Sequence, residues 1–174
     1  MSARPNPASV LRTLSQLAET IAEDKSSDAI FAATADAANA AIGHALFTVM
    51  AFDAETMEVK RVYSSNRQAY PPGGVKKKRD TAWGRQVLEQ GEPYIGYSAD
   101  DIRANFNDHE VILGLGLQSV LNMPVRIEGH TLGTMNLLHE RDYYGAQDFE
   151  TASLLAVMLV GPLRAEDVFQ RGRR

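Results

Sequence analysis

The chain has 174 residues, of which 44% are hydrophobic and 23% are charged, and its net charge is −4. These values are typical of a single globular domain that is long enough to bury a core. The absence of Cys excludes disulfides, thiolate metal sites, a Cys nucleophile and thioether attachment of a cofactor.

Two further features concern location and partners. No segment approaches 18 consecutive apolar residues, and the N-terminal MSARPNPAS lacks the apolar stretch of a signal peptide. We therefore expect a cytoplasmic protein without membrane contact. Positive charge is concentrated in one short run, KKKR at 76–79, whereas a nucleic-acid-binding protein usually carries a positive face. We expect no nucleic-acid partner, and the composition leaves the role of this run open.

The N-terminal part of the chain predicts two helices. Asn6 is a suitable cap, Pro7 suits the first helical position, and apolar residues then recur at helical spacing as far as Ile21. A second helix, capped by Ser27, is expected through AIFAATADAANAAI and ends near Gly43.

The pattern beyond Gly43 changes to alternate strands with short helices. The expected elements are strands at 46–52 and 57–63, a short helix at 81–89, a short strand at 93–96, a helical turn at 108–113, strands at 118–127 and 130–139, and a last helix from about 146 towards 169. Residues 152–163 are almost entirely apolar, so this helix must be covered on more than one side. The order predicts an α+β fold, with an antiparallel sheet and helices segregated largely to one face.

Three segments in this order resemble the GAF domain family of small-molecule sensory modules. They are TAWGRQVLEQGEPYI (81–95), SVLNMPVRIEGHTLGTMNLLH (119–139) and YGAQDFETASLLAVML (144–159). The resemblance extends over roughly 10–165. We therefore expect one GAF-like domain over 1–174, with its core at about 10–165 and flexible ends at 1–5 and 170–174.

The resemblance implies an antiparallel sheet of five or six strands, with the terminal helices on one face. Loops and short helices on the other face would enclose a pocket. GAF domains bind cyclic nucleotides, tetrapyrroles, amino acids and other small metabolites, and many dimerise through their terminal helices. Because a fold does not choose among ligands, the ligand stays unknown. We expect a sensor of a polar or anionic metabolite that forms a homodimer and signals to a separate output protein.

Several activities of the family do not carry over to this sequence. Thiol-based reduction of methionine sulfoxide and covalent bilin attachment both require Cys. A cyclic-nucleotide signature is absent, because Asn66 is followed by Arg67 and no Asp-Glu pair follows Phe106 at the required offset. The four His residues lack metal-binding spacing, so no metal site is expected.

The stretch VYSSNRQAYPPGGVKKKRDTAWG (62–84) is the main candidate for a ligand-binding segment. Polar and aromatic residues precede a PPGG run, which has the make-up of a hinged flap, and cations follow it. Arg67 and a Lys of the cationic run would receive a carboxylate or phosphate. The alternative is a solvated loop. The candidates are Tyr63, Asn66, Arg67, Tyr70 and Trp83, joined by Phe106 and His109 from a second loop.

Two Asn residues complete the candidate set. Asn122 and Asn136 lie within otherwise apolar strands, where an unpaired amide costs about 2 kcal/mol or more. Each must therefore bond to the backbone, to the other Asn or to ligand. A two-residue loop at Glu128-Gly129 would put them on opposite faces of the sheet, and a three-residue loop would put them side by side. The sequence leaves both possibilities open.

Two rival functions remain. One is a hydrolase or isomerase that uses His109 with Asp108 or Asp101, although no nucleophile elbow or phosphate loop accompanies them. The other is a dimerising interaction module without a ligand. We assign no catalytic residues.

Overall fold

A six-stranded antiparallel sheet forms the middle layer of the computed structural model, which describes residues 6–23, 26–78 and 80–165. Its strand order is β3-β2-β1-β6-β5-β4. The strands are β1 (Leu46–Asp53), β2 (Glu58–Ser64), β3 (Gly73–Lys77), β4 (Tyr94–Gly96), β5 (Ser119–Ile127) and β6 (His130–His139). The predicted α+β fold with a central antiparallel sheet is confirmed.

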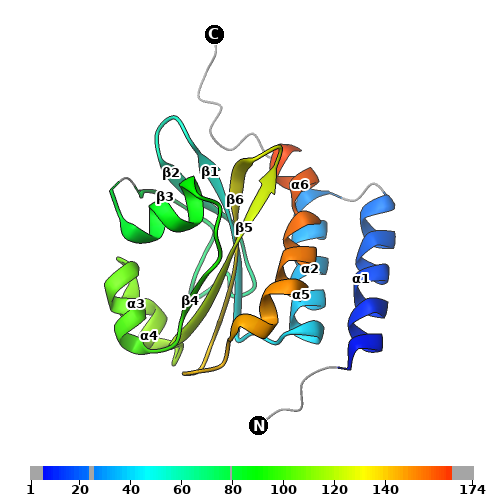
Figure 1. The fold of residues 1–174 in the computed structure, drawn as a ribbon, viewed down its shortest axis with the longest axis horizontal. Helices are drawn as coiled ribbons and strands as arrows, with labels where there is room; N and C mark the ends of the chain where they lie inside the picture. Colours follow the sequence, from blue (N-terminus) through cyan, green and yellow to red (C-terminus); the bar gives the residue numbers. More distant parts are fainter. Residues whose placement is uncertain (1–5, 24–25, 79, 166–174) are drawn as a thin grey trace.

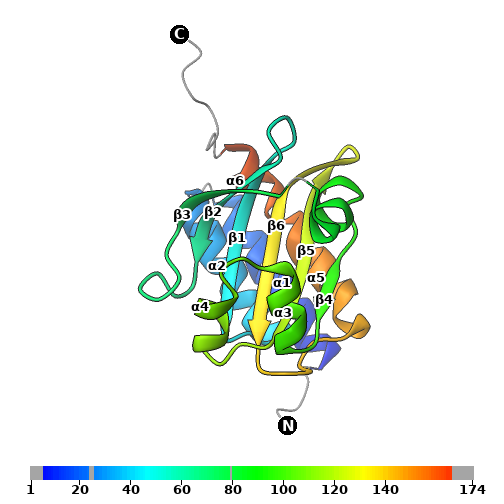
Figure 2. The same ribbon diagram turned by 90° about the vertical axis from the view of Figure 1, so that its left-hand side faces the viewer.

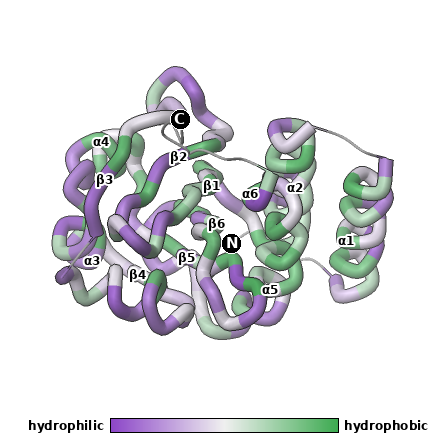
Figure 3. Tube along the Cα trace, turned by 90° about the horizontal axis from the view of Figure 1, so that it is seen from above, coloured by the Kyte–Doolittle hydropathy of each residue, from purple (hydrophilic) through white to green (hydrophobic). Residues whose placement is uncertain are grey.

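Helices cover both faces of this sheet (Figure 1). One face carries α1 (Pro7–Ala22), α2 (Ser27–Ala41), α5 (Phe149–Val157) and α6 (Val160–Ala165), with the short η2 (Ala146–Asp148) leading into α5. The other face carries η1 (Gly84–Glu89), α3 (Ala99–Asn105) and α4 (His109–Gly114), which Figure 2 shows in front of the strands. Seen from above in Figure 3, α2 separates α1 from the sheet, so the N-terminal helix forms an outer layer.

Side-chain alternation along the central strands divides the core between the two faces. In β1, Phe47 and Val49 belong to the larger apolar cluster beneath the long helices, whereas Leu46 belongs to a second cluster on the opposite face. Leu121 and Leu137 likewise join the larger cluster. Thr48, Asn122 and Asn136, each next to one of these residues, therefore point towards the short helices.

A β-bulge in the β5–β6 hairpin decides how these two strands face each other. Glu128 and Gly129 form a two-residue turn with φ of 52° and 79°, as a type I′ turn requires. Arg126 pairs with Thr131 but Val125 pairs with Gly133, so one extra residue lies in β6. The bulge shifts the register by one residue and puts the side chains beyond it on the same faces as a three-residue loop would.

A second bulge lies between β1 and β2. Val49 pairs with Tyr63, but Met50 pairs with Arg61, so Val62 is the extra residue. In a regular strand, residues 61 and 63 would share a face. Here Tyr63 packs beneath the helices while Arg61 faces the opposite side of the sheet.

One of the two helix caps predicted from the sequence is confirmed. The side chain of Asn6 accepts a hydrogen bond from the Ala8 amide at 2.8 Å, which confirms the predicted cap of α1. The expected cap of α2 was one residue too late, because Ser26 rather than Ser27 accepts from the Ala29 amide, at 3.3 Å. Ser is a favourable cap at either of these two adjacent positions, so the sequence alone does not show which of the two Ser residues caps the helix.

The last helix was expected to be continuous, but the structure divides it into two helices. A turn at 158–159 separates α5 from α6, and the expected extension to 169 lies outside the described residues. Pro162 lies in the first turn of α6, where its missing amide hydrogen costs no helical bond. Within 6–23, 26–78 and 80–165, none of the helices has the length and apolar character needed to cross a membrane.

The residues after Pro72 form an edge strand rather than the expected hinged flap. Gly73 and Gly74 adopt φ of 101° and 71°, a region that glycine tolerates better than other residues, and β3 then pairs with β2. Strand pairing fixes the backbone, so the stretch is part of the sheet. Arg79, the last cation of the run, lies outside the described residues.

Candidate functional site

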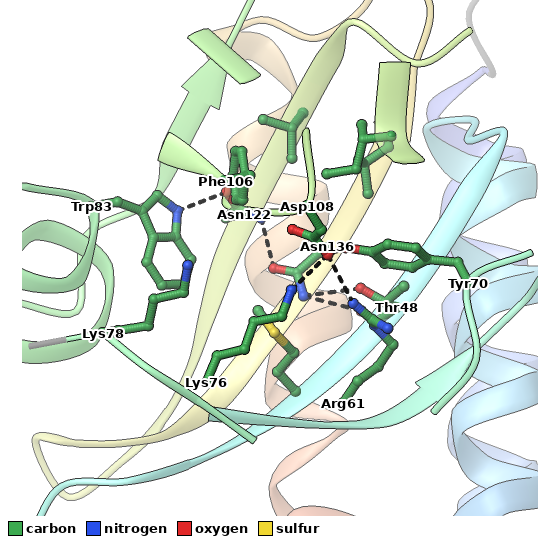
Figure 4. Close-up of a pocket in the computed structure, with 14 residues that line it drawn as sticks. Thr48, Arg61, Tyr70, Lys76, Lys78, Trp83, Phe106, Asp108, Asn122 and Asn136 are labelled. Atoms are coloured by element: carbon green, nitrogen blue, oxygen red, sulfur yellow. Dashed lines mark hydrogen bonds and ion pairs between the residues drawn. The ribbon is translucent and has the colours of Figure 1, made fainter. Parts of the chain in front are cut away.

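A cavity lies on the face of the sheet that carries the short helices (Figure 4). Its volume is about 30 Å³, which is room for about one water molecule, so a larger ligand requires lining side chains to move. Strands β1, β2, β3, β5 and β6 and the segments around η1 and α4 contribute to its wall. It is lined by Thr48, Met50, Arg61, Tyr70, Lys76, Lys78, Trp83, Phe106, Asp108, Ile112, Val120, Asn122, Asn136 and Leu138.

A directional chain of hydrogen bonds crosses the floor of the cavity. The indole Nε1 of Trp83 donates to Oδ1 of Asn122 at 2.9 Å, and Nδ2 of Asn122 donates to Oδ1 of Asn136 at 2.7 Å. Nδ2 of Asn136 in turn donates to Oγ1 of Thr48 at 3.2 Å. The β5–β6 bulge makes this chain possible, because it sets the two Asn residues directly opposite each other. The question left open by the sequence is answered: they share a face and bond to each other.

Three basic side chains and a single carboxylate give the cavity its charge. Nζ of Lys76 lies 2.6 Å from Oδ2 of Asp108, and Nη2 of Arg61 lies 3.4 Å from the same oxygen. The Tyr70 hydroxyl also donates to this oxygen, and the guanidinium of Arg61 lies 3.5 Å from the centroid of the Tyr70 ring. Figure 4 shows these side chains converging on Asp108 from β2, β3 and the segment before β3.

The environment of Asp108 favours its ionised form. Burial alone would raise the pKa of this carboxyl, but the hydrogen bonds from Lys76 and Tyr70 and the charge of Lys76 outweigh burial and lower it. Burial and the hydrogen bond to Asp108 raise the pKa of Tyr70 far above its usual range. At neutral pH the site therefore holds a carboxylate and a neutral phenol.

Lys78 is the least exposed cation of the cavity. Its exposed fraction is 6%, and its Nζ lies 5.2 Å from the ring centre of Trp83 and 5.8 Å from that of Phe106. Burial and the neighbouring charge of Lys76 lower the pKa of Lys78, and the charge of Asp108 opposes this shift. Its ammonium is thus held mainly by aromatic faces, which attract cations by their ring quadrupoles.

The local sequence explains how two of the cations reach the cavity. In an extended strand successive side chains point to opposite faces. Lys76 and Lys78 face the cavity, whereas Val75 and Lys77 are exposed on the outer side of the edge strand. The side chains of the basic run therefore point alternately into the cavity and into solvent.

The structure brings together five of the nine residues predicted to bind ligand. These are Tyr70, Trp83, Phe106, Asn122 and Asn136. Whether they contact a ligand stays a prediction.

The other four predicted residues do not line the cavity. Tyr63 packs with Phe31 on the helical face, because the bulge at Val62 turns it away. Asn66 accepts a hydrogen bond from the Ala69 amide, and Arg67 is 56% exposed and pairs with an acid of α2. His109 is half-buried at the start of α4.

Sequence reasoning missed most of the charged lining. It named a Lys of 76–79 without choosing one, considered Asp108 only as an acid beside His109, and did not consider Arg61. The period-two pattern of β3 would have selected Lys76 and Lys78 if the stretch had been read as a strand. The site also contains Thr48, Met50, Ile112, Val120 and Leu138 from apolar segments.

The geometry suits an anionic small molecule more than a metal ion. Among the described residues, no three His, Asp or Glu side chains gather closely enough to hold a metal. The cavity instead combines basic groups, aromatic walls and buried amides.

Comparisons with solved structures agree on the fold. The chain is similar to the GAF domain of a phosphoenolpyruvate-protein phosphotransferase from Coxiella burnetii (16% identity, TM-score 0.75), covering 92% of this chain and 96% of that one. It is also similar to free methionine-R-sulfoxide reductase from Neisseria meningitidis, solved with its substrate (17% identity, TM-score 0.72, covering 95% and 94%). A third similar structure is the phycocyanobilin-bound GAF domain of a cyanobacterial phytochrome (15% identity, TM-score 0.69, covering 97% and 100%).

A search of curated proteins finds no match. The family model described as GAF domain matches residues 24–157, which is most of the chain and includes all the residues that line the cavity. The chain therefore belongs to the GAF domain family.

Proposed function

We propose that this GAF domain is a cytoplasmic sensor that binds a small anionic metabolite in the cavity between Trp83, Lys76 and Asn122. The single observation that carries the proposal is the excess of basic groups, three against one carboxylate, in a largely enclosed space. Charges in such a space are costly unless they are paired, so an anion is the ligand that the site favours.

The comparisons support this proposal at the level of the family. The similar reductase was solved with its substrate and the similar phytochrome domain with phycocyanobilin, so this fold holds small molecules in other proteins. Identities below 20% carry over no ligand, and the ligand class for this chain rests on its own residues.

The second part of the proposal is that a homodimer, formed through the helical layer, passes the signal to a separate output protein. Leu11 of α1 and Leu154 of α5 line one groove between these helices and are 69% and 50% exposed. Val157 of α5 is 54% exposed. An exposed apolar surface of this kind on terminal helices suits the helices of a second copy.

The enzyme alternative receives no support from a specific observation. His109 does not line the cavity, and no side-chain hydrogen bond joins it to Asp101 or Asp108 among the described residues. A general acid or base needs to reach its substrate within hydrogen-bond distance.

Thermal-shift screening of a metabolite library, followed by titration calorimetry of the hits, tests the ligand proposal. We expect hits among anionic compounds, with affinity at least about tenfold weaker in Lys76→Met, because a charge-assisted hydrogen bond is lost. Lys77→Met removes the same charge from the outer side of β3 and serves as the matched control, with affinity unchanged. A folded protein without anionic hits, or equal losses in both variants, would contradict the proposal and favour a ligand-free interaction module.

A further inference from the structure

We infer that the cavity takes a small dianion, with one anionic group against Lys78 and the other against Lys76 and Arg61, where it takes the place of the Asp108 carboxylate. The inference rests on the proposed function and adds the ligand's charge, the placing of its two groups and the side chain that it displaces.

The lining of the cavity carries more positive than negative charge. Arg61, Lys76 and Lys78 are basic, Asp108 is the one acid, and the remaining ten lining residues are uncharged. The fixed charges in the wall therefore leave two positive charges without a counterpart there once Asp108 is counted, and three once it has moved away. A monoanion would leave an excess of one positive charge with Asp108 in place and of two once it has moved away, whereas a dianion would leave none and one, so a dianion balances the wall better in both states.

The Asp108 carboxylate lies where three donor side chains converge. A single carboxylate oxygen, Oδ2, is the acceptor for Lys76, Arg61 and Tyr70. These donors form the kind of converging set that binds a ligand carboxylate or phosphate oxygen. The Asp108 carboxylate thus occupies the place that a ligand anion would take.

Asp108 is also a side chain that can leave this position at little cost to its own helix. It stands at the N-cap position of α4, yet its side chain makes no capping hydrogen bond. Among the described residues, the side-chain partners of Asp108 on other residues lie across the cavity, on β2, on β3 and at Tyr70. An incoming anion that satisfies the same donors frees Asp108 towards solvent without removing a cap from α4.

Lys78 defines the position of the second anionic group. Among the residues that the structure describes, Nζ of Lys78 has no hydrogen-bond or ion-pair partner, and it lies over the faces of Trp83 and Phe106. A buried ammonium without a counterion is costly. Nε of Arg61 is likewise buried without a hydrogen-bond partner among these residues. Nζ of Lys78 is therefore available to a ligand, and Nε of Arg61 is a donor that no described group uses.

Size limits the ligand further. With Asp108 in place the cavity has a volume of about 30 Å³, so only a small ligand that displaces the Asp108 carboxylate can enter. Dicarboxylates and phosphate monoesters of a few carbon atoms share the required charge and size, and the experiment distinguishes these two sources.

The test compares each dianion with a monoanion of nearly the same shape. Succinate is paired with monomethyl succinate, and methyl phosphate with dimethyl phosphate, in titration calorimetry at pH 7.5. We expect one dianion to bind at least about tenfold more tightly than its monoanionic partner, because a second charge-assisted contact forms. The pair that shows this preference identifies the ligand as a carboxylate or a phosphate.

Three variants assign the contacts. Lys78→Met should abolish the preference for the dianion, whereas the adjacent and outward-facing Lys77→Met should retain it. Asp108→Asn, checked for folding by circular dichroism, should strengthen binding of the dianion about tenfold, because an internal competitor is removed.

The results distinguish a failure of the inference from a failure of the proposed function. Equal affinity for monoanions and dianions, or no binding of either pair while other anionic metabolites bind, would overturn the inference and leave the anion-sensing function standing. A folded Asp108→Asn protein that binds the dianion more weakly would overturn the displacement. If no anionic compound binds, both proposals are wrong.

Discussion

Asp108 is the residue on which two of the three basic side chains of the cavity, Arg61 and Lys76, converge. Because Lys76 and Tyr70 hold its pKa below the usual range, its ionised form stabilises the folded state. Such a group contributes stability at pH values above its pKa in the unfolded chain. The contribution disappears as the pH falls through the lower pKa of the folded protein.

Replacement of Asp108 by Asn should therefore lower the free energy of unfolding at pH 7 by about 1–3 kcal/mol. The difference from the wild type should shrink as the pH falls below about 4, where the carboxyl of the unfolded chain takes up a proton. Urea unfolding at several pH values measures both quantities.

The matched control for this measurement is Asp142→Asn. Asp142 is 65% exposed and, among the described residues, its side chain pairs with its neighbour Arg141 alone, so its loss should change stability by less than about 0.5 kcal/mol. A deficit in Asp108→Asn that stays constant from pH 7 to pH 3 would show that the ion pair is not its source.

At the scale of elements, two bulges determine which side chains meet at the cavity. The bulge at Val62 turns Arg61 towards the cavity and Tyr63 away from it, and the bulge at Leu132 sets Asn122 opposite Asn136. Gly133, next to the second bulge, allows β6 to approach β1: a Cβ there would lie 2.0 Å from the carbonyl oxygen of Met50.

Gly133→Ala should consequently destabilise the protein by about 3 kcal/mol, because a backbone carbonyl cannot move aside without disturbing the β1–β6 pairing. Chemical denaturation measures the loss. Gly161→Ala is the control, since a Cβ at this exposed helical position meets nothing within 4 Å and should stabilise α6 by up to about 1 kcal/mol. Wild-type stability of Gly133→Ala would mean that the strands can separate there at no cost.

At the scale of the whole molecule, the cavity and the exposed apolar helices lie on opposite faces of one sheet. Strand β5 belongs to both sides: Asn122 lies in the cavity, while Leu121 and Met123 belong to the core beneath the helices. A change at the cavity floor therefore has a direct physical contact with the layer that we propose as the dimer interface. The packing supplies a connection, and coupling itself must be measured.

The proposed dimer predicts that Leu154→Glu combined with Val157→Glu gives monomers, because like charges and buried carboxylates oppose association. The dissociation constant should rise at least about a hundredfold, as expected when apolar anchors are lost from an interface. Sedimentation velocity over a range of concentrations measures it.

Val75→Glu is the control for the dimer measurement. Val75 is 41% exposed on β3, away from the long helices, so the variant should associate like the wild type. A wild-type protein that is monomeric at every concentration would contradict the proposed interface.

The sequence by itself determined those features that depend on neighbours along the chain. Apolar periodicity and the Asn6 cap predicted helices and strands, and their order predicted the α+β fold and the GAF resemblance. Aromatic and amide residues that are unusual within their segments, such as Trp83 and Asn122, were identified as candidate site residues for the same reason.

Only the tertiary structure decided which candidates meet. One residue of slippage between paired strands moves a side chain to the other face of a sheet. The bulges that turned Tyr63 away and joined Asn122 to Asn136 arise from contacts between strands, which no local pattern encodes. The convergence of Arg61 and Lys76 on Asp108 likewise joins segments that are distant in sequence, because strand pairing and the packing of α4 bring their charges within hydrogen-bond distance.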